Sequence, residues 1–185
     1  MDSKLQIISG RFHGRKLYLP PNARPTQNRA RAALFNMLGA RLVDPMEKLN
    51  VWDAFAGSGA FGIECLSRYP NVNVVFTDVD TESVKTIKKN LGMLNVGANG
   101  RVDMTDAIAA VAKYGAMADL VFVDAPYDTP ELGAALVQKL AQVAHEKTIL
   151  VWEQEAARAR ELPDGWRTVR DKQYGRARFL IAVRE

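Results

Sequence analysis

From residue 49 onward, short apolar runs alternate with segments of helical periodicity, and this alternation limits the possible folds more than any other feature. The strand-like runs lie at residues 49–54, 71–78, 101–104, 119–124 and 147–153. The helical segments lie near residues 60–68, 81–94, 105–114 and 131–145. Strands that are apolar on both faces and separated by helices are typical of a parallel sheet covered on both sides. The sequence therefore predicts a doubly wound, Rossmann-like α/β sheet.

The last residues predict the remaining strands. Residues 165–185 contain two β-rich runs that break at Gly175, with no helix between them. Such a segment forms an antiparallel hairpin, and a mixed sheet accommodates it at one edge. We predict a sheet of seven strands within a domain of residues 46–185.

The first 45 residues differ in charge from this domain. They contain eight Lys or Arg residues and two Asp residues, whereas the other 140 contain 17 Lys or Arg and 19 Asp or Glu. Their pattern predicts a small hairpin at residues 5–19, a Pro-rich loop at 20–25 and a helix capped by Thr26. Residues 1–45 are thus a basic extension. Its positive charge is explained equally well by a polyanionic partner and by a basic surface exposed to solvent.

The composition narrows the classes of protein. Apolar residues make up 48% of the chain, enough for a sizeable core. No apolar run reaches the roughly 18 residues of a membrane span, and the first residues lack the apolar stretch of a signal peptide. Cys65 is the single cysteine, and the two histidines, His13 and His145, are far apart in the sequence. We expect a cytoplasmic monomer without a metal site.

Acidic residues stand at the carboxyl ends of four consecutive predicted strands: Asp53, Asp78, Asp106 and Asp124. Ligands of open α/β sheets bind beyond these ends, and a buried acid without a partner is costly. A binding function therefore explains the four carboxylates better than packing does. Helix capping is an alternative for Asp106, because Asp is a common N-cap residue.

A Gly-x-Gly-x-x-Gly turn begins at Gly57, and Asp78 follows at the distance of a ribose-binding acid in dinucleotide sites. Asp53 argues against NAD, because a carboxylate four residues before the first glycine would repel the pyrophosphate. S-adenosylmethionine carries an ammonium and a sulfonium but no phosphate. Its carboxylate could lie at the helix N-terminus and its ammonium near Asp53, with the ribose at Asp78 and the adenine amino group at Asp106.

Several blocks of sequence accompany these acids. They are Ile7 to Leu17, Arg24-Pro25-Thr26, Arg29 to Leu38, Asp53-x-Phe55-Ala56-Gly57-Ser58-Gly59 with the helix after it, and Asp124-Ala125-Pro126-Tyr127. Together with Asp78 and Asp106 they resemble the bacterial RsmD-type enzymes, a family of class I S-adenosylmethionine-dependent methyltransferases. The resemblance extends from about residue 6 to the hairpin at Tyr174. The N-terminal blocks are specific to that family, whereas the glycine turn is widespread.

This resemblance implies methylation of the N2 amino group of guanine 966 in 16S ribosomal RNA, with a small-subunit assembly particle as the partner. It implies cofactor binding by Asp53, Phe55, Gly57, Gly59, Asp78 and Asp106. It implies catalysis by Asp124, Ala125, Pro126 and Tyr127. The candidate contacts to RNA phosphates are Arg11, Arg15, Lys16, Arg24, Arg29 and Arg31.

The fourth strand end carries the chemistry in this resemblance. The Asp124 carboxylate and the main-chain carbonyl of residue 125 would hold the two N–H groups of the target amine, and Tyr127 would stack on the extruded base. The family usually has Asp-Pro-Pro-Tyr here, so Ala125 is a departure. Alanine supplies the same carbonyl, and Pro126 still restrains the residue before it. We expect a changed rate or affinity rather than lost function.

Three alternatives use the same residues. A nicotinamide oxidoreductase is disfavoured by Asp53. A methyltransferase acting on DNA adenine or protein glutamine would share the motif at Asp124 but not the basic N-terminal blocks. A non-catalytic paralogue would bind RNA and transfer no methyl group.

Overall fold

The computed structural model describes residues 5–21, 28–44 and 46–185, without the side chains of residues 40 and 41. Its centre is one sheet with the strand order β3-β2-β1-β4-β5-β7-β6. The strands β1 to β5 run parallel, and β7 pairs antiparallel with both β5 and β6. The strands are β1 (Leu49–Asp53), β2 (Val72–Asp78), β3 (Gly100–Met104), β4 (Leu120–Val123), β5 (Ile149–Glu155), β6 (Trp166–Tyr174) and β7 (Ala177–Arg184).

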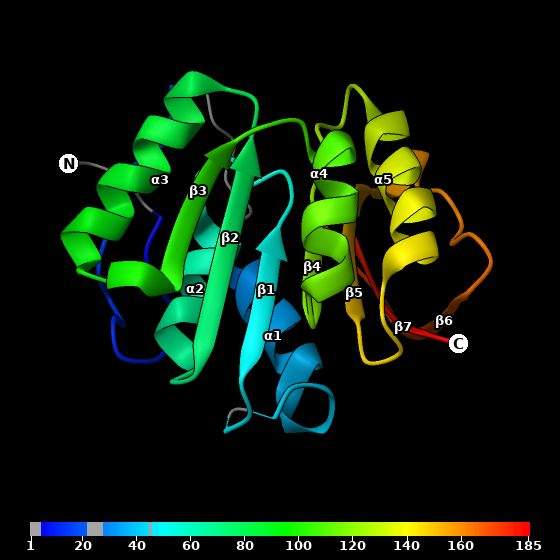
Figure 1. The fold of residues 1–185 in the computed structure, drawn as a ribbon, viewed down its shortest axis with the longest axis horizontal. Helices are drawn as coiled ribbons and strands as arrows, with labels where there is room; N and C mark the ends of the chain where they lie inside the picture. Colours follow the sequence, from blue (N-terminus) through cyan, green and yellow to red (C-terminus); the bar gives the residue numbers. More distant parts are fainter. Residues whose placement is uncertain (1–4, 22–27, 45) are drawn as a thin grey trace.

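Helices cover both faces of this sheet. Figure 1 shows α4 and α5 in front of the sheet and α1 and α2 behind it. The helices are α1 (Asn28–Leu42), α2 (Ala60–Arg68), α3 (Thr81–Leu94), α4 (Ala107–Tyr114) and α5 (Pro130–Val143), with short 3₁₀ turns η1 (Gly97–Asn99), η2 (Gly115–Met117) and η3 (Ala156–Arg158). The core divides accordingly into two clusters. One packs α1, α2 and α3 on the sheet, and the other packs α4 and α5.

The prediction of a seven-stranded Rossmann-like sheet is confirmed. The terminal hairpin forms as expected, with a turn at Gly175 that has a φ of 60°. The bounds of α3 also match the prediction. Asp80 caps the start of α3 by accepting a hydrogen bond from the Ser83 N–H at 2.7 Å, and Asn95 ends the helix in the left-handed conformation.

The basic N-terminal segment packs against the same core. Leu5, Ile7 and Leu17 are buried in the cluster that contains α1 and α2. The predicted hairpin at residues 5–19 forms only in part, as a single antiparallel bridge between Gln6 and Lys16. The predicted cap, Thr26, lies outside the described residues.

Two further features bear on the possible functions. Among the described helices, none is both long and apolar enough to cross a lipid bilayer. Within the same part of the chain, no three His, Cys, Asp or Glu side chains gather as metal ligands. Cys65 is fully buried in α2.

Candidate active site

The turn between β1 and α2 is built around a buried carboxylate. Asp53 ends β1 with 1% of its surface exposed, and its Oδ2 accepts a hydrogen bond from the Gly62 N–H at 3.0 Å. Gly57 and Gly59 have positive φ values of 52° and 75°, which side chains with a Cβ rarely adopt. Gly62 allows α2 to approach the sheet, since a Cβ there would lie 2.3 Å from the Phe76 ring.

Burial changes the protonation of Asp53. The loss of hydration raises the pKa of its carboxyl to about 8, and the nearby charge of Asp78 adds to the increase. The hydrogen bond from Gly62 opposes this effect only in part. A cation bound beside Asp53 would favour the charged carboxylate, as the sequence-based hypothesis for the S-adenosylmethionine ammonium requires.

The next two strand ends carry the other predicted cofactor acids. Asp78 accepts hydrogen bonds from the N–H groups of Gly57, at 2.7 Å, and Asp80, at 2.9 Å. Asp106 is the N-cap of α4, where its Oδ1 accepts from the Ala109 N–H at 2.8 Å. The capping alternative therefore holds for Asp106. Its side chain remains exposed at the same edge of the sheet.

Apolar side chains that sequence reasoning missed lie beside these acids. Val79 follows Asp78, and Met104 ends β3, with 66% and 62% of their surfaces exposed. Large apolar side chains so exposed at a ligand edge suit the faces of a purine ring. The signal in the sequence was weak, because a single apolar residue after a strand is common.

These groups fit the parts of S-adenosylmethionine. Gly59 gives the N-terminus of α2 no side-chain cap, and although the Gly62 N–H donates to Asp53, the N–H groups before it in the first turn can donate hydrogen bonds to a carboxylate. A Cβ at Gly57 would meet nothing within 4 Å, which leaves the turn open to a ligand. Phe55, also predicted to contact the cofactor, is half-buried and packs against the cluster under α4 and α5.

The end of β4 brings the predicted catalytic residues next to Asp53. Strand pairing places Asp53 opposite Phe122 and Val123 opposite Trp152. Because side chains alternate along a strand, Asp124 points to the same face of the sheet as Asp53. Ala125 is buried, Pro126 is exposed, and Tyr127 is half-buried.

A residue absent from the sequence predictions completes this cluster. The same pairing sets Glu153 of β5 beside Asp124, with 4% of its surface exposed. The hydroxyl of Tyr127 donates a hydrogen bond to Glu153 Oε1 at 3.2 Å. Glu153 thus fixes the ring of the tyrosine that is expected to stack on a base.

Burial and the charges of neighbouring acids change the pKa values within this cluster. Burial raises the pKa of Asp124 well above its usual range, and the charges of Glu153 and Asp53 raise it further. Burial and Glu153 likewise raise the pKa of Tyr127, so its hydroxyl keeps its proton and donates. For the predicted role, in which Asp124 holds an amine, the carboxylate would be the favoured form, because both of its oxygens accept hydrogen bonds from N–H groups.

The six residues predicted to contact RNA differ in their exposure to solvent. Arg11, Arg15, Lys16 and Arg29 are exposed, and Arg24 lies outside the described residues. Arg31 is 2% exposed. The prediction that Arg31 contacts RNA is therefore wrong, because its guanidinium is buried within the protein.

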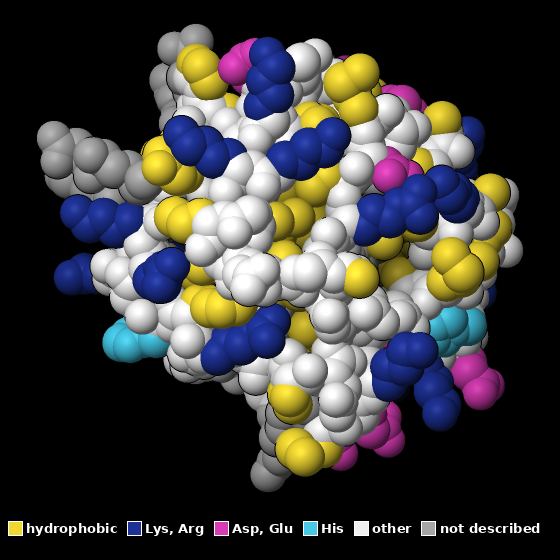
Figure 2. Space-filling view, turned by 60° about the vertical axis from the view of Figure 1, so that its left-hand side comes forward, with side chains coloured by type: hydrophobic (Ala, Val, Ile, Leu, Met, Phe, Trp, Pro, Cys, Tyr) yellow, Lys and Arg dark blue, Asp and Glu magenta, His cyan; other side chains and the backbone are white. Residues whose placement is uncertain are grey.

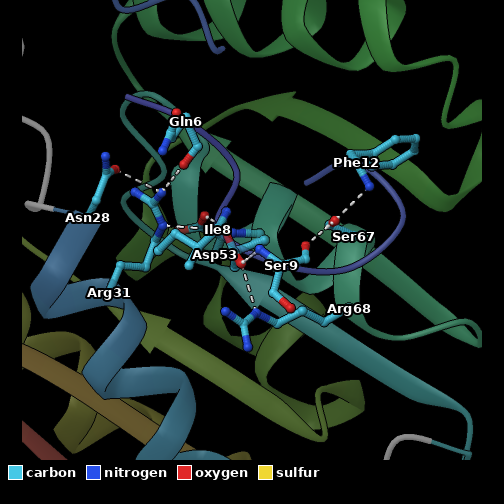
Figure 3. Close-up of polar contacts among 11 residues, drawn as sticks. Gln6, Ile8, Ser9, Phe12, Asn28, Arg31, Asp53, Ser67 and Arg68 are labelled. Atoms are coloured by element: carbon cyan, nitrogen blue, oxygen red, sulfur yellow. Dashed lines mark hydrogen bonds and ion pairs between the residues drawn. The ribbon is translucent and has the colours of Figure 1, made fainter. Parts of the chain in front are cut away.

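Arg31 instead belongs to a buried network around Glu64 of α2 (Figure 3). The Glu64 carboxylate accepts hydrogen bonds from the N–H groups of Ile8, at 2.9 Å, and Ser9, at 3.0 Å, and from Arg68 Nε at 2.8 Å. Arg31 Nε lies 3.6 Å from Glu64 Oε2. Burial lowers the pKa of Arg31, and Glu64 counteracts that effect. This network fastens the N-terminal segment to α1 and α2.

The exposed cations Arg11 and Arg15 lie at the opposite end of the strands from Asp124. Arg11 Nε donates to the Leu66 carbonyl in the last turn of α2, and Arg15 Nη2 donates to the Met93 carbonyl in the last turn of α3. Both helices begin at the carboxyl ends of strands, so their last turns lie near the amino ends. Figure 2 shows many Lys and Arg side chains and few acids on the face that carries α3 and the N-terminal segment.

Comparison with known proteins identifies a family model, curated relatives and solved structures that are similar to this chain. The family model described as Conserved hypothetical protein 95 matches residues 5–183. The chain is similar to the ribosomal RNA small subunit methyltransferase D of Escherichia coli, with 34% identity over 98% of this chain and 91% of the relative. It is also similar to the solved structure of yhhF from Escherichia coli, with a TM-score of 0.83, 32% identity and 98% of each chain covered. The fold alone is shared with precorrin-6y C5,15-methyltransferase from Geobacter metallireducens, with a TM-score of 0.66, 16% identity and coverage of 91% and 94%.

Proposed function

Because the chain belongs to the family of the ribosomal RNA small subunit methyltransferase D proteins, we propose that it methylates the N2 amino group of a guanine in 16S ribosomal RNA, at the position corresponding to guanine 966. The observation that carries this proposal is the cluster of Asp53, Asp124 and Glu153 at the ends of the neighbouring strands β1, β4 and β5. It sets the cofactor-binding turn beside an acceptor for an amine.

The cofactor in this proposal is S-adenosylmethionine, which supplies an electrophilic methyl group on a sulfonium. The N-terminus of α2 would bind its carboxylate, and Asp53 its ammonium. Asp78 would accept from the ribose hydroxyls, while Val79 and Met104 would contact the faces of the adenine. These assignments use groups that already stand at one edge of the sheet.

The catalytic task of the protein is to aim a weak nucleophile. The lone pair of the guanine N2 amine is delocalised into the ring, so the amine attacks a methyl carbon only when it is held in line. Asp124 and the carbonyl of Ala125 would accept its two N–H groups. Positioning of this kind can supply about 7–11 kcal/mol of a barrier. Transfer of the methyl group from the bound cofactor would require the amine to lose one proton, which the Asp124 carboxylate or water would take up.

Tyr127 would hold the plane of the base. A base inside a helix cannot reach this edge, so the guanine must be extruded or already unstacked. Stacking on an aromatic ring contributes roughly 1–3 kcal/mol per base. The hydrogen bond from Tyr127 to Glu153 keeps the ring in one orientation before the base arrives.

Ala125 is the departure from the usual Asp-Pro-Pro-Tyr motif. Its backbone carbonyl would serve the same role, and the residue is buried, with 7% of its surface exposed. The loss of one proline relaxes the loop, since Pro126 alone restrains it. We expect a lower rate with the same product.

The proposal is tested with a single-turnover assay on 16S ribosomal RNA and on small-subunit particles, using S-adenosylmethionine with a labelled methyl group. Asp124→Ala should lose most of the transfer while the cofactor still binds, as measured by calorimetry. Tyr127→Ala should lose less. Near-normal transfer by Asp124→Ala, or a preference for NAD in the binding assay, would refute the mechanism.

The same experiment separates the alternatives. Mapping the labelled nucleotide distinguishes guanine N2 from other amines, and a DNA or protein acceptor would leave the RNA unlabelled. A non-catalytic paralogue would bind RNA without incorporating label. A ribosomal substrate would support a cytoplasmic location, and methylation of particles but not of naked RNA would identify an assembly intermediate as the partner.

A further inference from the structure

Two arginines near Asp124, where the proposed target base would bind, belong to the C-terminal part of the chain and not to the basic N-terminal segment. Arg11 and Arg15 lie at the amino ends of the strands, far from Asp124. Arg158 ends η3, which directly follows β5. Arg176 lies at the tip of the β6–β7 hairpin, and the pairing of Glu155 with Ala177 brings this tip to the carboxyl end of β5. Arg158 and Arg176 therefore lie at the edge that holds the catalytic cluster.

Their contacts form a small organised unit. Arg158 Nη1 donates to the carbonyl oxygen of Tyr127 at 3.4 Å. Glu155 lies between the two arginines, with Oε1 at 2.5 Å from Arg176 Nη2 and Oε2 at 3.7 Å from Arg158 Nε. The two arginine side chains are 60% and 71% exposed. This unit carries two positive charges and one negative charge.

We propose that Arg158 and Arg176 bind the RNA phosphates that flank the nucleotide presented to Asp124. The inference rests on the proposed function and identifies where that substrate is held. An extruded base leaves its phosphates at the rim of the pocket, and a guanidinium matches a phosphate with two parallel hydrogen bonds. The ion pairs with Glu155 bring the two guanidinium groups close together before the RNA binds.

The acids near Arg158 and Arg176 leave both guanidinium groups able to bind a phosphate. Asp128 and Glu161 are exposed, and Glu155 accepts a hydrogen bond from Arg176 and forms a longer ion pair with Arg158. Exposed ion pairs are weak and screened by salt, so a phosphate can replace part of the Glu155 contact at small cost. The contact between Arg158 and the Tyr127 carbonyl then links phosphate binding to the loop that carries the stacking ring.

The test compares two double variants in titrations with 16S ribosomal RNA at several salt concentrations. Arg158→Ala with Arg176→Ala should raise Kd roughly tenfold or more. It should also flatten the plot of log affinity against log salt by about 0.7–0.9 per lost contact. The matched control, Lys139→Ala with Arg167→Ala, removes two exposed cations on α5 and at the far end of β6. It should leave both quantities near wild type.

The outcomes separate this inference from the proposed function. A wild-type protein that methylates no ribosomal RNA would end the proposed function, whatever the arginines do. Wild-type methylation together with a salt slope unchanged in Arg158→Ala with Arg176→Ala would overturn the phosphate contacts. S-adenosylmethionine affinity should stay unchanged in this variant. Should the double variant melt early, the single variants Arg158→Ala and Arg176→Ala decide. In each single variant, a salt slope flattened relative to that of the control supports the contacts, and a slope equal to that of the control in both refutes them.

Discussion

Replacing Asp53 by Asn tests the electrostatics of the cofactor turn. In the folded protein, burial raises the pKa of Asp53 to about 8, whereas the ordinary value is 3.8. At a pH between these two pKa values, Asp53 keeps its proton in the folded state and has lost it in the unfolded state. The free energy of unfolding therefore falls as pH rises through this range, and the full contribution is present only below the lower value.

The size of the effect follows from the same values. Each pH unit within the range costs the folded protein about 1.4 kcal/mol relative to a variant that cannot ionise at this position. Between pH 5 and pH 7, the free energy of unfolding of the wild type should fall by about 3 kcal/mol relative to Asp53→Asn. Above pH 8 the difference between the two proteins should level off, because both states of the wild type are then ionised.

The measurement is urea denaturation of both proteins without cofactor across this pH range, with Asp164→Asn as a control for removal of an exposed carboxylate. Parallel pH profiles for the wild type and Asp53→Asn would refute the reasoning. A second readout uses the ligand. S-adenosylmethionine binding at pH 7 should release a proton from Asp53, which calorimetry detects as a heat that depends on the buffer. Asp53→Asn should abolish that release and weaken binding.

Three other substitutions test separate parts of the structure. Glu64→Ala should lower the free energy of unfolding by about 3–5 kcal/mol in urea, because it leaves a guanidinium buried without its carboxylate; a cost under about 1 kcal/mol would contradict the network. Gly62→Ala should lower it by about 1–3 kcal/mol, since the new Cβ meets the Phe76 ring, and an unchanged melting temperature would argue against that close approach. Glu153→Gln should shift the acid limb of the single-turnover pH profile to lower pH, because the charge of Glu153 raises the pKa of Asp124; an unshifted limb would separate the two groups.

The fold was predictable because its signals are local. Strands buried on both faces must be apolar throughout, and the helices between them have a different period. The ends of α3 were equally local, since Asp80 caps one end and Asn95 stops the other. The placement of Asp53, Asp78, Asp106 and Asp124 at one edge followed from the general geometry of parallel strands.

The role of each arginine was not predictable in this way. Arg31 stands among exposed arginines in the sequence and shares their composition and spacing. Its burial depends on Glu64, which lies in another helix and accepts from three other groups as well. A count of charge along the first 45 residues cannot show which cation has an internal partner.

Glu153 illustrates the same limit at the active site. In the sequence Glu153 follows the apolar residues 149–152 within β5, and an acid near the end of a strand has many explanations. Its role follows from the register of β5 against β4, which sets Glu153 beside Asp124. There Glu153 accepts a hydrogen bond from the Tyr127 hydroxyl. The motif at residues 124–127 is therefore only part of the catalytic unit. The strand that neighbours it supplies the group that fixes the tyrosine and tunes the aspartate, and the β6–β7 hairpin beyond it brings the cations to the same edge.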